Sequence, residues 1–127
     1  MKNYFSALIK NRIYLITGST GFIGSFVANE LSKNKARLIL VDESMKKLLL
    51  KKKKLSKNNK NIKIYSCNFL DHNEKKIIFE KIKIENKKID CLINNASIVG
   101  DTKLTGWNEK FDDQSTDSWQ KCLEVNL

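Results

Sequence analysis

Three glycines spaced three residues apart follow a short apolar run near the start of the chain. Residues 17–24 read Thr-Gly-Ser-Thr-Gly-Phe-Ile-Gly, a G-x-x-G-x-x-G pattern. Gly18 permits a tight turn, Gly21 lets the backbone approach a pyrophosphate, and Gly24 lets the following helix lie close to the strand. Backbone N–H groups and the helix dipole would hold the anion. An ordinary glycine turn is the alternative interpretation.

An aspartate ends the second apolar run, 24 residues after Gly18. The carboxylate of Asp42 can accept hydrogen bonds from both ribose hydroxyls of an adenosine, and it would repel a 2′-phosphate. Neither Ser19 nor Thr20 is the basic residue that such a phosphate requires. A solvated acid at a strand end is the alternative. The glycine turn and the acid each stand where the other requires it, and together they favour NAD over NADP.

Asparagines stand at two further places where polar groups could serve a ligand. Asn94, Asn95 and Ala96 directly follow the fourth apolar run, where side-chain amides can bridge loops and line a crevice. Asn126 comes seven residues after Trp119 and so falls on the apolar stripe of the last helix, where a polar group needs a partner. Because 14 residues of the chain are Asn, chance placement is the alternative at both positions.

Short apolar runs alternate with segments of helical periodicity. The strand-like runs occupy residues 13–17, 37–41, 62–66 and 89–93, and the first is continuously apolar, as in a parallel strand covered on both faces. Strands that alternate with helices of this length predict βαβ units and right-handed crossovers. The expected fold is therefore α/β: a Rossmann-like doubly wound parallel sheet, truncated to about four strands, with helices on both faces. Residues 1–127 are expected to form a single domain.

Apolar residues at helical spacing define the faces that the helices should bury. The expected stripes are Ile23, Phe26, Val27 and Leu31; Met45, Leu48, Leu49 and Leu55; and Trp119, Cys122 and Leu123. The lysine run 51–54 is interpreted as a solvated helix face. Asp71, followed by Glu74, predicts a helix cap, and Ser115 a second one. The 18 residues 97–114 form a loop long enough to suspect a function.

Composition excludes several classes of protein. The net charge is +10, but 22 of the 24 basic residues are Lys spread along the chain, which argues against a specific nucleic-acid partner. No apolar run approaches the roughly 18 residues of a membrane span, and residues 1–10 lack the features of a signal peptide. The expected location is cytoplasmic, without a membrane partner. Cys67, Cys91 and Cys122 suit neither a disulfide frame nor a metal site and are expected to be buried.

Taken in order, these motifs resemble the N-terminal half of a short-chain dehydrogenase/reductase, from about residue 11 to 127. Asn-Asn-Ala at 94–96 and Val-Asn-Leu at 125–127 are the most specific elements. The resemblance implies a dinucleotide site and a catalytic Asn126, whose backbone helps to organise a proton-relay water. Residues 18–24 would hold the pyrophosphate, Asp42 the adenosine ribose, two residues the adenine, and three the ribose near the nicotinamide: Gly18, Ser19, Thr20, Gly21, Phe22, Ile23, Gly24, Asp42, Asn68, Phe69, Asn94, Asn95 and Ala96.

The sequence also departs from the family pattern. Phe22 stands where typical members have the second glycine of T-G-x-x-x-G-x-G, which is similar to the extended, sugar-nucleotide-modifying branch. Asn68 stands where Asp is commoner, and Ser97 replaces a Gly. The loop 100–111 resembles members that modify carbohydrates. The family's catalytic Ser and Tyr-x-x-x-Lys do not occur, so the chain is expected to be a fragment that is inactive alone.

Two classes of function therefore remain open. The first is an NAD-dependent oxidoreductase that transfers hydride between a nicotinamide and an alcohol or carbonyl substrate, with a carbohydrate as one candidate, and that forms a homo-oligomer when intact. The second is a non-catalytic dinucleotide-binding fragment or pseudoenzyme. A sugar-nucleotide epimerase or dehydratase of the extended branch is a further alternative. The identity of the substrate is not readable from these residues.

Overall fold

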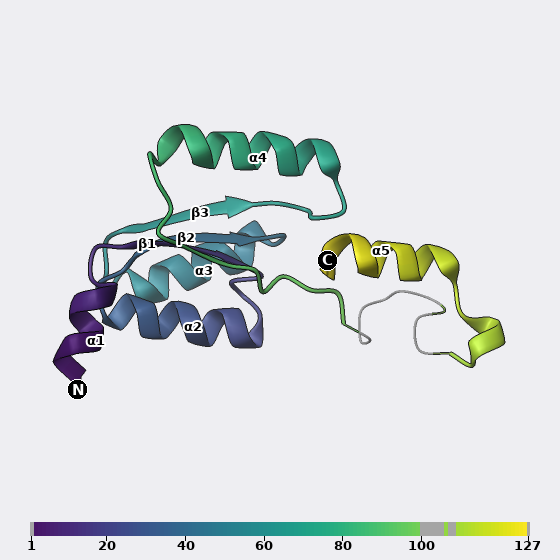
Figure 1. The fold of residues 1–127 in the computed structure, drawn as a ribbon, viewed down its shortest axis with the longest axis horizontal. Coiled ribbons are helices and arrows are strands. Elements are labelled where there is room, and N and C mark those ends of the chain that lie inside the picture. The colour runs from purple at the N-terminus through teal and green to yellow at the C-terminus, as the bar shows by residue number, and fades with distance from the viewer. Residues whose placement is uncertain (1, 100–105, 107–108, 127) are drawn as a thin grey trace.

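The structure is a computed structural model that describes residues 2–99, 106 and 109–126, and the side chains of these except residues 2–5. Four parallel strands form one sheet in the order β3-β2-β1-β4 (Figure 1). They are β1 (Ile13–Thr17), β2 (Arg37–Asp42), β3 (Ile62–Ser66) and β4 (Cys91–Ile93). Parallel neighbours require crossover connections, and here each crossover from β1 to β4 contains a helix.

Helices cover both faces of this sheet. α2 (Phe22–Lys33) and α3 (Met45–Leu55) lie on one face, and α4 (His72–Glu85) lies on the other (Figure 1). α1 (Lys2–Ile9) precedes β1, while a 3₁₀ turn, η1 (Phe111–Asp113), and α5 (Thr116–Asn126) follow β4. The predicted Rossmann-like parallel sheet is confirmed. Within the described ranges, no helix combines the length and apolar character needed to cross a bilayer.

Alternate strand residues pack into two separate apolar layers, because successive side chains point to opposite faces. The layer under α2 and α3 contains Ile16, Ala28, Leu31, Leu38, Leu40, Leu48 and Leu55. The layer under α4 contains Leu15, Ile39, Val41, Tyr65, Cys67 and Ile82. Burial on both faces explains the apolar sequences of β1 and β2, whereas the edge strand β3 carries the half-buried Lys63.

The observed elements differ from the predicted ones at β4 and at the N-terminus. The strand predicted over 89–93 is confined to Cys91–Ile93. Asp90 explains the difference, because its Oδ2 accepts the N–H of Ile13 at 2.8 Å while its own N–H donates to the Ile13 carbonyl at 2.9 Å. The Asp90 side chain thus accepts the N–H of Ile13 in place of a backbone carbonyl, and the regular pairing of β4 with β1 begins only at Cys91. α1 has no counterpart among the predicted helices.

The buried face of α3 is rotated from the predicted stripe. Leu48 and Leu55 are buried as expected, but Met45 and Leu49 are 43% and 55% exposed. Lys51 occupies the buried position between the two leucines and is only 8% exposed. The interpretation of the run 51–54 as a solvated face is therefore wrong at its first residue.

α2 and α5 also turn outward part of their predicted stripes. Four of these residues are exposed: Ile23, Phe26, Trp119 and Leu123. Small residues occupy the buried faces instead, with Gly24, Ala28 and Ser32 in α2 and Ser118 and Cys122 in α5. A helix that packs through small residues approaches its neighbour closely, and its larger residues are then left at the sides. The loop predicted over 97–114 lies in part outside the described residues, as do Trp107 and Leu127.

The predicted helix caps are present. Asp71 Oδ1 accepts the N–H of Glu74 at 2.9 Å, and Ser115 Oγ accepts the N–H of Ser118 at 3.3 Å. α3 has a similar cap, because Ser44 Oγ accepts the N–H of Lys47 at 3.3 Å. Such caps satisfy N–H groups that a helix leaves without an internal partner.

The three cysteines are free thiols. Cys67 and Cys122 are buried, as predicted, whereas Cys91 on the edge strand β4 is half-buried. Burial raises the pKa of the Cys67 thiol, and the neighbouring Glu74 carboxylate adds to the effect.

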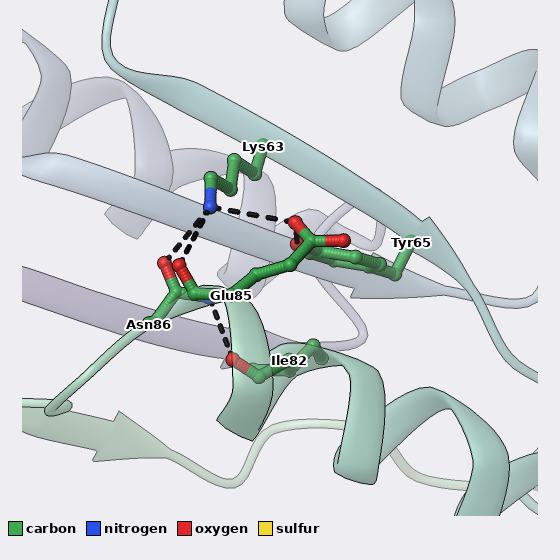
Figure 2. Close-up of polar contacts among 5 residues, drawn as sticks. All are labelled: Lys63, Tyr65, Ile82, Glu85 and Asn86. Atoms are coloured by element: carbon green, nitrogen blue, oxygen red, sulfur yellow. Dashed lines mark hydrogen bonds and ion pairs between the residues drawn. The ribbon is translucent and has the colours of Figure 1, made fainter.

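A polar network joins the carboxyl end of α4 to β3 (Figure 2). The Tyr65 hydroxyl donates to Glu85 Oε2 at 2.6 Å, and Lys63 Nζ donates to Glu85 and to Asn86 Oδ1. Asn86 Nδ2 in turn donates to the Ile82 carbonyl at 2.7 Å in the last turn of α4. Burial and the hydrogen bond to Glu85 raise the pKa of Tyr65 to about 12, so its hydroxyl stays protonated at neutral pH.

This network predicts an acid-sensitive contribution to stability. The hydrogen bonds from Tyr65 and Lys63 lower the pKa of Glu85 below its ordinary value of 4.5. Its contribution to folding is therefore complete above the unfolded-state pKa and is lost as pH falls through the folded-state pKa. We expect Glu85→Gln to lower Tm at pH 7 and to have a smaller effect near pH 3. Glu80→Gln, on the exposed side of the same helix, is the control, and a Tm difference for Glu85→Gln that is constant with pH would contradict this assignment.

Candidate functional site

A pocket of about 440 Å³ opens at the carboxyl ends of the strands, between the turn after β1 and the segment after β4. β2 and β4 lie on opposite sides of β1, so the strand order reverses here. This reversal is where open parallel α/β sheets bind ligands. The lining residues are Gly18, Thr20, Gly21, Phe22, Ile23, Asp42, Glu43, Lys47, Asn68, Phe69, Leu70, Asn95, Ala96, Ser97, Ile98, Val99 and Val125.

The floor of the pocket depends on two glycines that admit no side chain. Gly18 has φ of +59°, and a Cβ on it would lie 2.8 Å from Ala96 Cα. A Cβ on Gly24 would lie 2.3 Å from the Gly18 carbonyl oxygen and 2.7 Å from Asn95 Nδ2. The tight turn and the close approach predicted from the sequence are both present. The role predicted for Gly21, the approach of the backbone to a pyrophosphate, stays a prediction.

The helix that begins at this turn has no side-chain cap. Gly21 is the N-cap residue of α2 and provides no side-chain acceptor, in contrast to Ser44 of α3 and Asp71 of α4. The first hydrogen bond of α2 runs from the N–H of Ser25 to the Gly21 carbonyl at 2.9 Å. The N–H groups of residues 22–24 lie ahead of this first bond, at the positive end of the helix dipole, which borders the pocket. This arrangement suits an anion.

Asp42 forms the wall of the pocket beside the turn. Its Oδ2 accepts the backbone N–H of Thr20 at 2.9 Å, and the residue is 9% exposed. Ser19 is buried beneath it, with both its N–H and its hydroxyl donated to the Val41 carbonyl at 3.2 Å. The turn after β1 is thus tied to the end of β2, and a carboxylate is held in a fixed orientation at the pocket edge.

Asn95 joins the two sides of the pocket. Its Nδ2 donates to the carbonyls of Thr17 and Gly18 at 3.2 and 3.0 Å. Thr17 Oγ1 accepts the backbone N–H groups of Asn95 and Ala96, both at 3.0 Å. The bridging of loops predicted for this side chain is therefore present, whereas Asn94 is exposed and does not line the pocket.

Asn126 finds its polar partner in the backbone after β4. Its Oδ1 accepts the N–H of Ile98 at 2.8 Å, and its Nδ2 donates to the Ile98 carbonyl at 3.0 Å. The side chain is exposed rather than buried on the apolar stripe. It nevertheless holds α5 against a pocket-lining segment, and Val125 next to it lines the pocket itself.

The structure thus brings together most of the residues that the sequence indicates. Four of them do not line the pocket: Ser19, Gly24, Asn94 and Asn126. Seven lining residues were not predicted: Glu43, Lys47, Leu70, Ser97, Ile98, Val99 and Val125. Glu43 and Lys47 could have been found, because Glu43 immediately follows Asp42 and Lys47 lies in the first turn of the next helix. Val125 could not, since the path of the chain before α5 has no sequence signal.

Among the described residues, no group of three or more His, Cys, Asp or Glu side chains is placed to hold a metal ion. The polar groups around the pocket are backbone amides, two carboxylates, two side-chain amides, two hydroxyls and one lysine. This donor set fits a phosphorylated nucleoside: N–H groups for phosphate and carboxylate oxygens for ribose hydroxyls.

Comparison with known proteins agrees with this geometry. A family model described as short chain dehydrogenase matches residues 12–127. The match covers most of the chain, so the chain belongs to the short-chain dehydrogenase family, a family of oxidoreductases.

Curated relatives match nearly the whole of this chain. The 3beta-hydroxysteroid dehydrogenase of Mediterraneibacter gnavus is 27% identical over 116 residues, which are 91% of this chain and 40% of the relative. The 2-dehydro-3-deoxy-D-gluconate 5-dehydrogenase of Pseudoalteromonas atlantica is 27% identical over 123 residues, 94% of this chain and 44% of the relative. The chain therefore spans less than half the length of these relatives.

Solved structures share the fold. A metagenomic short-chain oxidoreductase in complex with NADP has a TM-score of 0.81 at 18% identity, covering 94% of this chain and 52% of its own. An NAD⁺-bound xylitol dehydrogenase has a TM-score of 0.78 at 21% identity, covering 94% and 44%.

Gly24, within α2, and Gly21, its N-cap residue, should differ sharply in how much stability is lost on substitution by alanine. Gly24→Ala forces a Cβ into the Gly18 carbonyl, and we expect a loss of about 3 kcal/mol in the free energy of unfolding. Gly21→Ala meets only the Gly18 oxygen, at 3.3 Å, and keeps a negative φ. It should cost about 1 kcal/mol, as for other caps. Urea denaturation of both variants measures the difference, and equal midpoints would show that the packing at Gly24 is not limiting.

Proposed function

We propose that residues 1–127 form the dinucleotide-binding part of an NAD-dependent oxidoreductase of the short-chain dehydrogenase type. One observation supports this most strongly: an uncapped helix start, a glycine turn and a held carboxylate border one pocket at the strand-order reversal. Each of these features suits a different part of the same dinucleotide. An ordinary glycine turn would not require the uncapped helix start or the carboxylate beside it.

We infer the following division of the ligand among the residues. The backbone at 18–24 binds the pyrophosphate, and Asp42 accepts hydrogen bonds from the adenosine ribose. Asn68 and Phe69, which line the pocket next to β3, flank the adenine. The segment 94–96 borders the ribose at the nicotinamide end. Ser19 and Gly24 act indirectly in this scheme, since they shape the turn from beneath.

The bound nicotinamide would supply the chemistry, by accepting or giving a hydride at an alcohol or carbonyl carbon. The residues of this chain bind and orient it. Asn126 is proposed as the family's catalytic Asn; its side chain is engaged with Ile98, which leaves its backbone as the group that helps to organise a proton-relay water. The family's Tyr, Lys and Ser are not among these 127 residues. Proton donation to the substrate oxygen would need them.

We propose NAD as the cofactor, on the charges that line the pocket. Asp42 and Glu43 place two carboxylates beside the position proposed for the ribose, and a 2′-phosphate there would meet like charge. Lys47 also lines the pocket and offsets part of this repulsion. Both cofactors occur in complexes of proteins with this fold, so the choice depends on these three side chains.

A carbohydrate-type alcohol is the substrate class that we propose. The sequence of the loop 100–111 motivates it, and one curated relative is named for a sugar acid. Another is named for a steroid, so the family alone does not decide. A non-catalytic dinucleotide-binding module, or an epimerase or dehydratase of the extended branch, is the competing proposal. We further propose a cytoplasmic, homo-oligomeric parent protein without a nucleic-acid partner.

Cofactor preference tests the role of Asp42. We expect NADH to bind more tightly than NADPH, and Asp42→Ala to weaken NADH by about tenfold, since hydrogen bonds to a charged group contribute about 1.5–3 kcal/mol. The affinity for NADPH should fall less, so the variant should prefer NADH over NADPH by a smaller factor than the wild type does. Glu43→Ala is the neighbouring control and should change NADH affinity little. Fluorescence titration measures the affinities of the wild type and both variants. Tighter binding of NADPH than of NADH by the wild type would contradict the proposed NAD preference.

Catalysis provides a second test. Residues 1–127 alone should not oxidise NADH in the presence of aldehydes, ketones or keto-sugars, because no Tyr-Lys pair is available to donate a proton. The absorbance of NADH at 340 nm follows the reaction. Turnover above the buffer blank that survives repurification would show that this chain has a proton donor of its own.

A further inference from the structure

Lys51 is a buried cation that the proposed site does not yet use. It lies on α3 and is 8% exposed. Its Nζ donates to the Ser25 carbonyl at 2.8 Å, to Ser25 Oγ at 2.5 Å and to Asn29 Oδ1 at 2.9 Å. All three acceptors belong to α2, so this one side chain joins the two helices.

The acceptors of Lys51 are neutral. Among the ion pairs of the described residues, none involves Lys51. Its burial and the nearby charge of Lys54 lower its pKa. A buried charge without an opposite charge is costly, and hydrogen bonds to neutral acceptors offset that cost only in part. Stability alone therefore gives no reason for a lysine here.

The location of this charge relative to the pocket supplies a reason. Ser25 is the residue whose N–H makes the first hydrogen bond of α2, to Gly21. The ammonium on the Ser25 carbonyl thus lies within about one helical turn of the uncapped N–H groups that border the pocket. Lys47 precedes Lys51 by four residues, on the same side of α3, and lines the pocket directly.

We infer that Lys51 is a positioning residue of the dinucleotide site: it fixes the first turn of α2 to α3 and places a positive charge behind the N–H groups that receive the pyrophosphate. The inference rests on the proposed function. Together with Lys47, it makes α3 the cationic support of a site whose other lining charges, Asp42 and Glu43, are negative. A phosphate group gains from this charge, whereas an uncharged nucleoside does not.

The test compares ADP with adenosine by isothermal titration calorimetry. Lys51→Met removes the charge and leaves an unbranched apolar side chain that is one heavy atom shorter. We expect it to weaken ADP by about tenfold, or about 1.4 kcal/mol, and to leave adenosine within about twofold. Lys54→Met, on the exposed side of the same helix, is the matched control and should change neither affinity. Lys51→Gln keeps a hydrogen-bond donor without the charge, and it replaces the Met variant if that variant does not fold.

The alternatives give different results. ADP affinity equal to that of the wild type in both Lys51 variants would overturn the inference. Parallel loss of ADP and adenosine affinity with a lower Tm would also overturn it, since that pattern belongs to a purely structural lysine. Failure of the wild type to bind NADH or ADP at all would instead contradict the proposed dinucleotide site. The two failures are therefore distinguishable.

Discussion

The close approach of α2 to the end of β1 is the constraint on which the rest of this structure depends. The Gly18 carbonyl lies where a side chain on Gly24 would begin, and Asn95 reaches the same carbonyl from the segment after β4. Helix, strand and loop thus converge on one peptide group. No residue larger than glycine fits at either position, so the shape of the site depends on the absence of side chains at Gly18 and Gly24.

Further hydrogen bonds connect the end of β1 to the strands on either side of it. Thr17 receives the N–H groups of the β4 side, while Ser19 and Asp42 tie the turn to β2. These contacts join residues more than 20 and more than 75 positions apart in the sequence, so the pocket forms only when all three strands are paired. A ligand bound there would stabilise the paired sheet by mass action.

The sequence was sufficient for the strands and for the parts of the site that follow them directly. Apolar runs identify β1 and β2 because both faces of the sheet are covered there. Asp42 is found because it ends β2, and Asn95 because it closely follows the fourth run. The rotation of the helices was not predictable in this way. α2 approaches β1 through Gly24 and Ala28, so Ile23 and Phe26 turn outward against the periodicity while Leu31 stays buried. Lys51 was misjudged for a related reason: its acceptors lie on another helix and carry no charge.

The buried thiol of Cys67 gives this fold a built-in reporter. It lies in the layer beneath α4, with no exposed surface and with a raised pKa. A thiol reagent reaches it when this layer opens, and the raised pKa of the thiol disfavours the reactive thiolate while the residue is buried. The rate of labelling at this residue therefore reports openings of the layer beneath α4. The half-buried Cys91 on β4 would report the opposite edge in the same experiment.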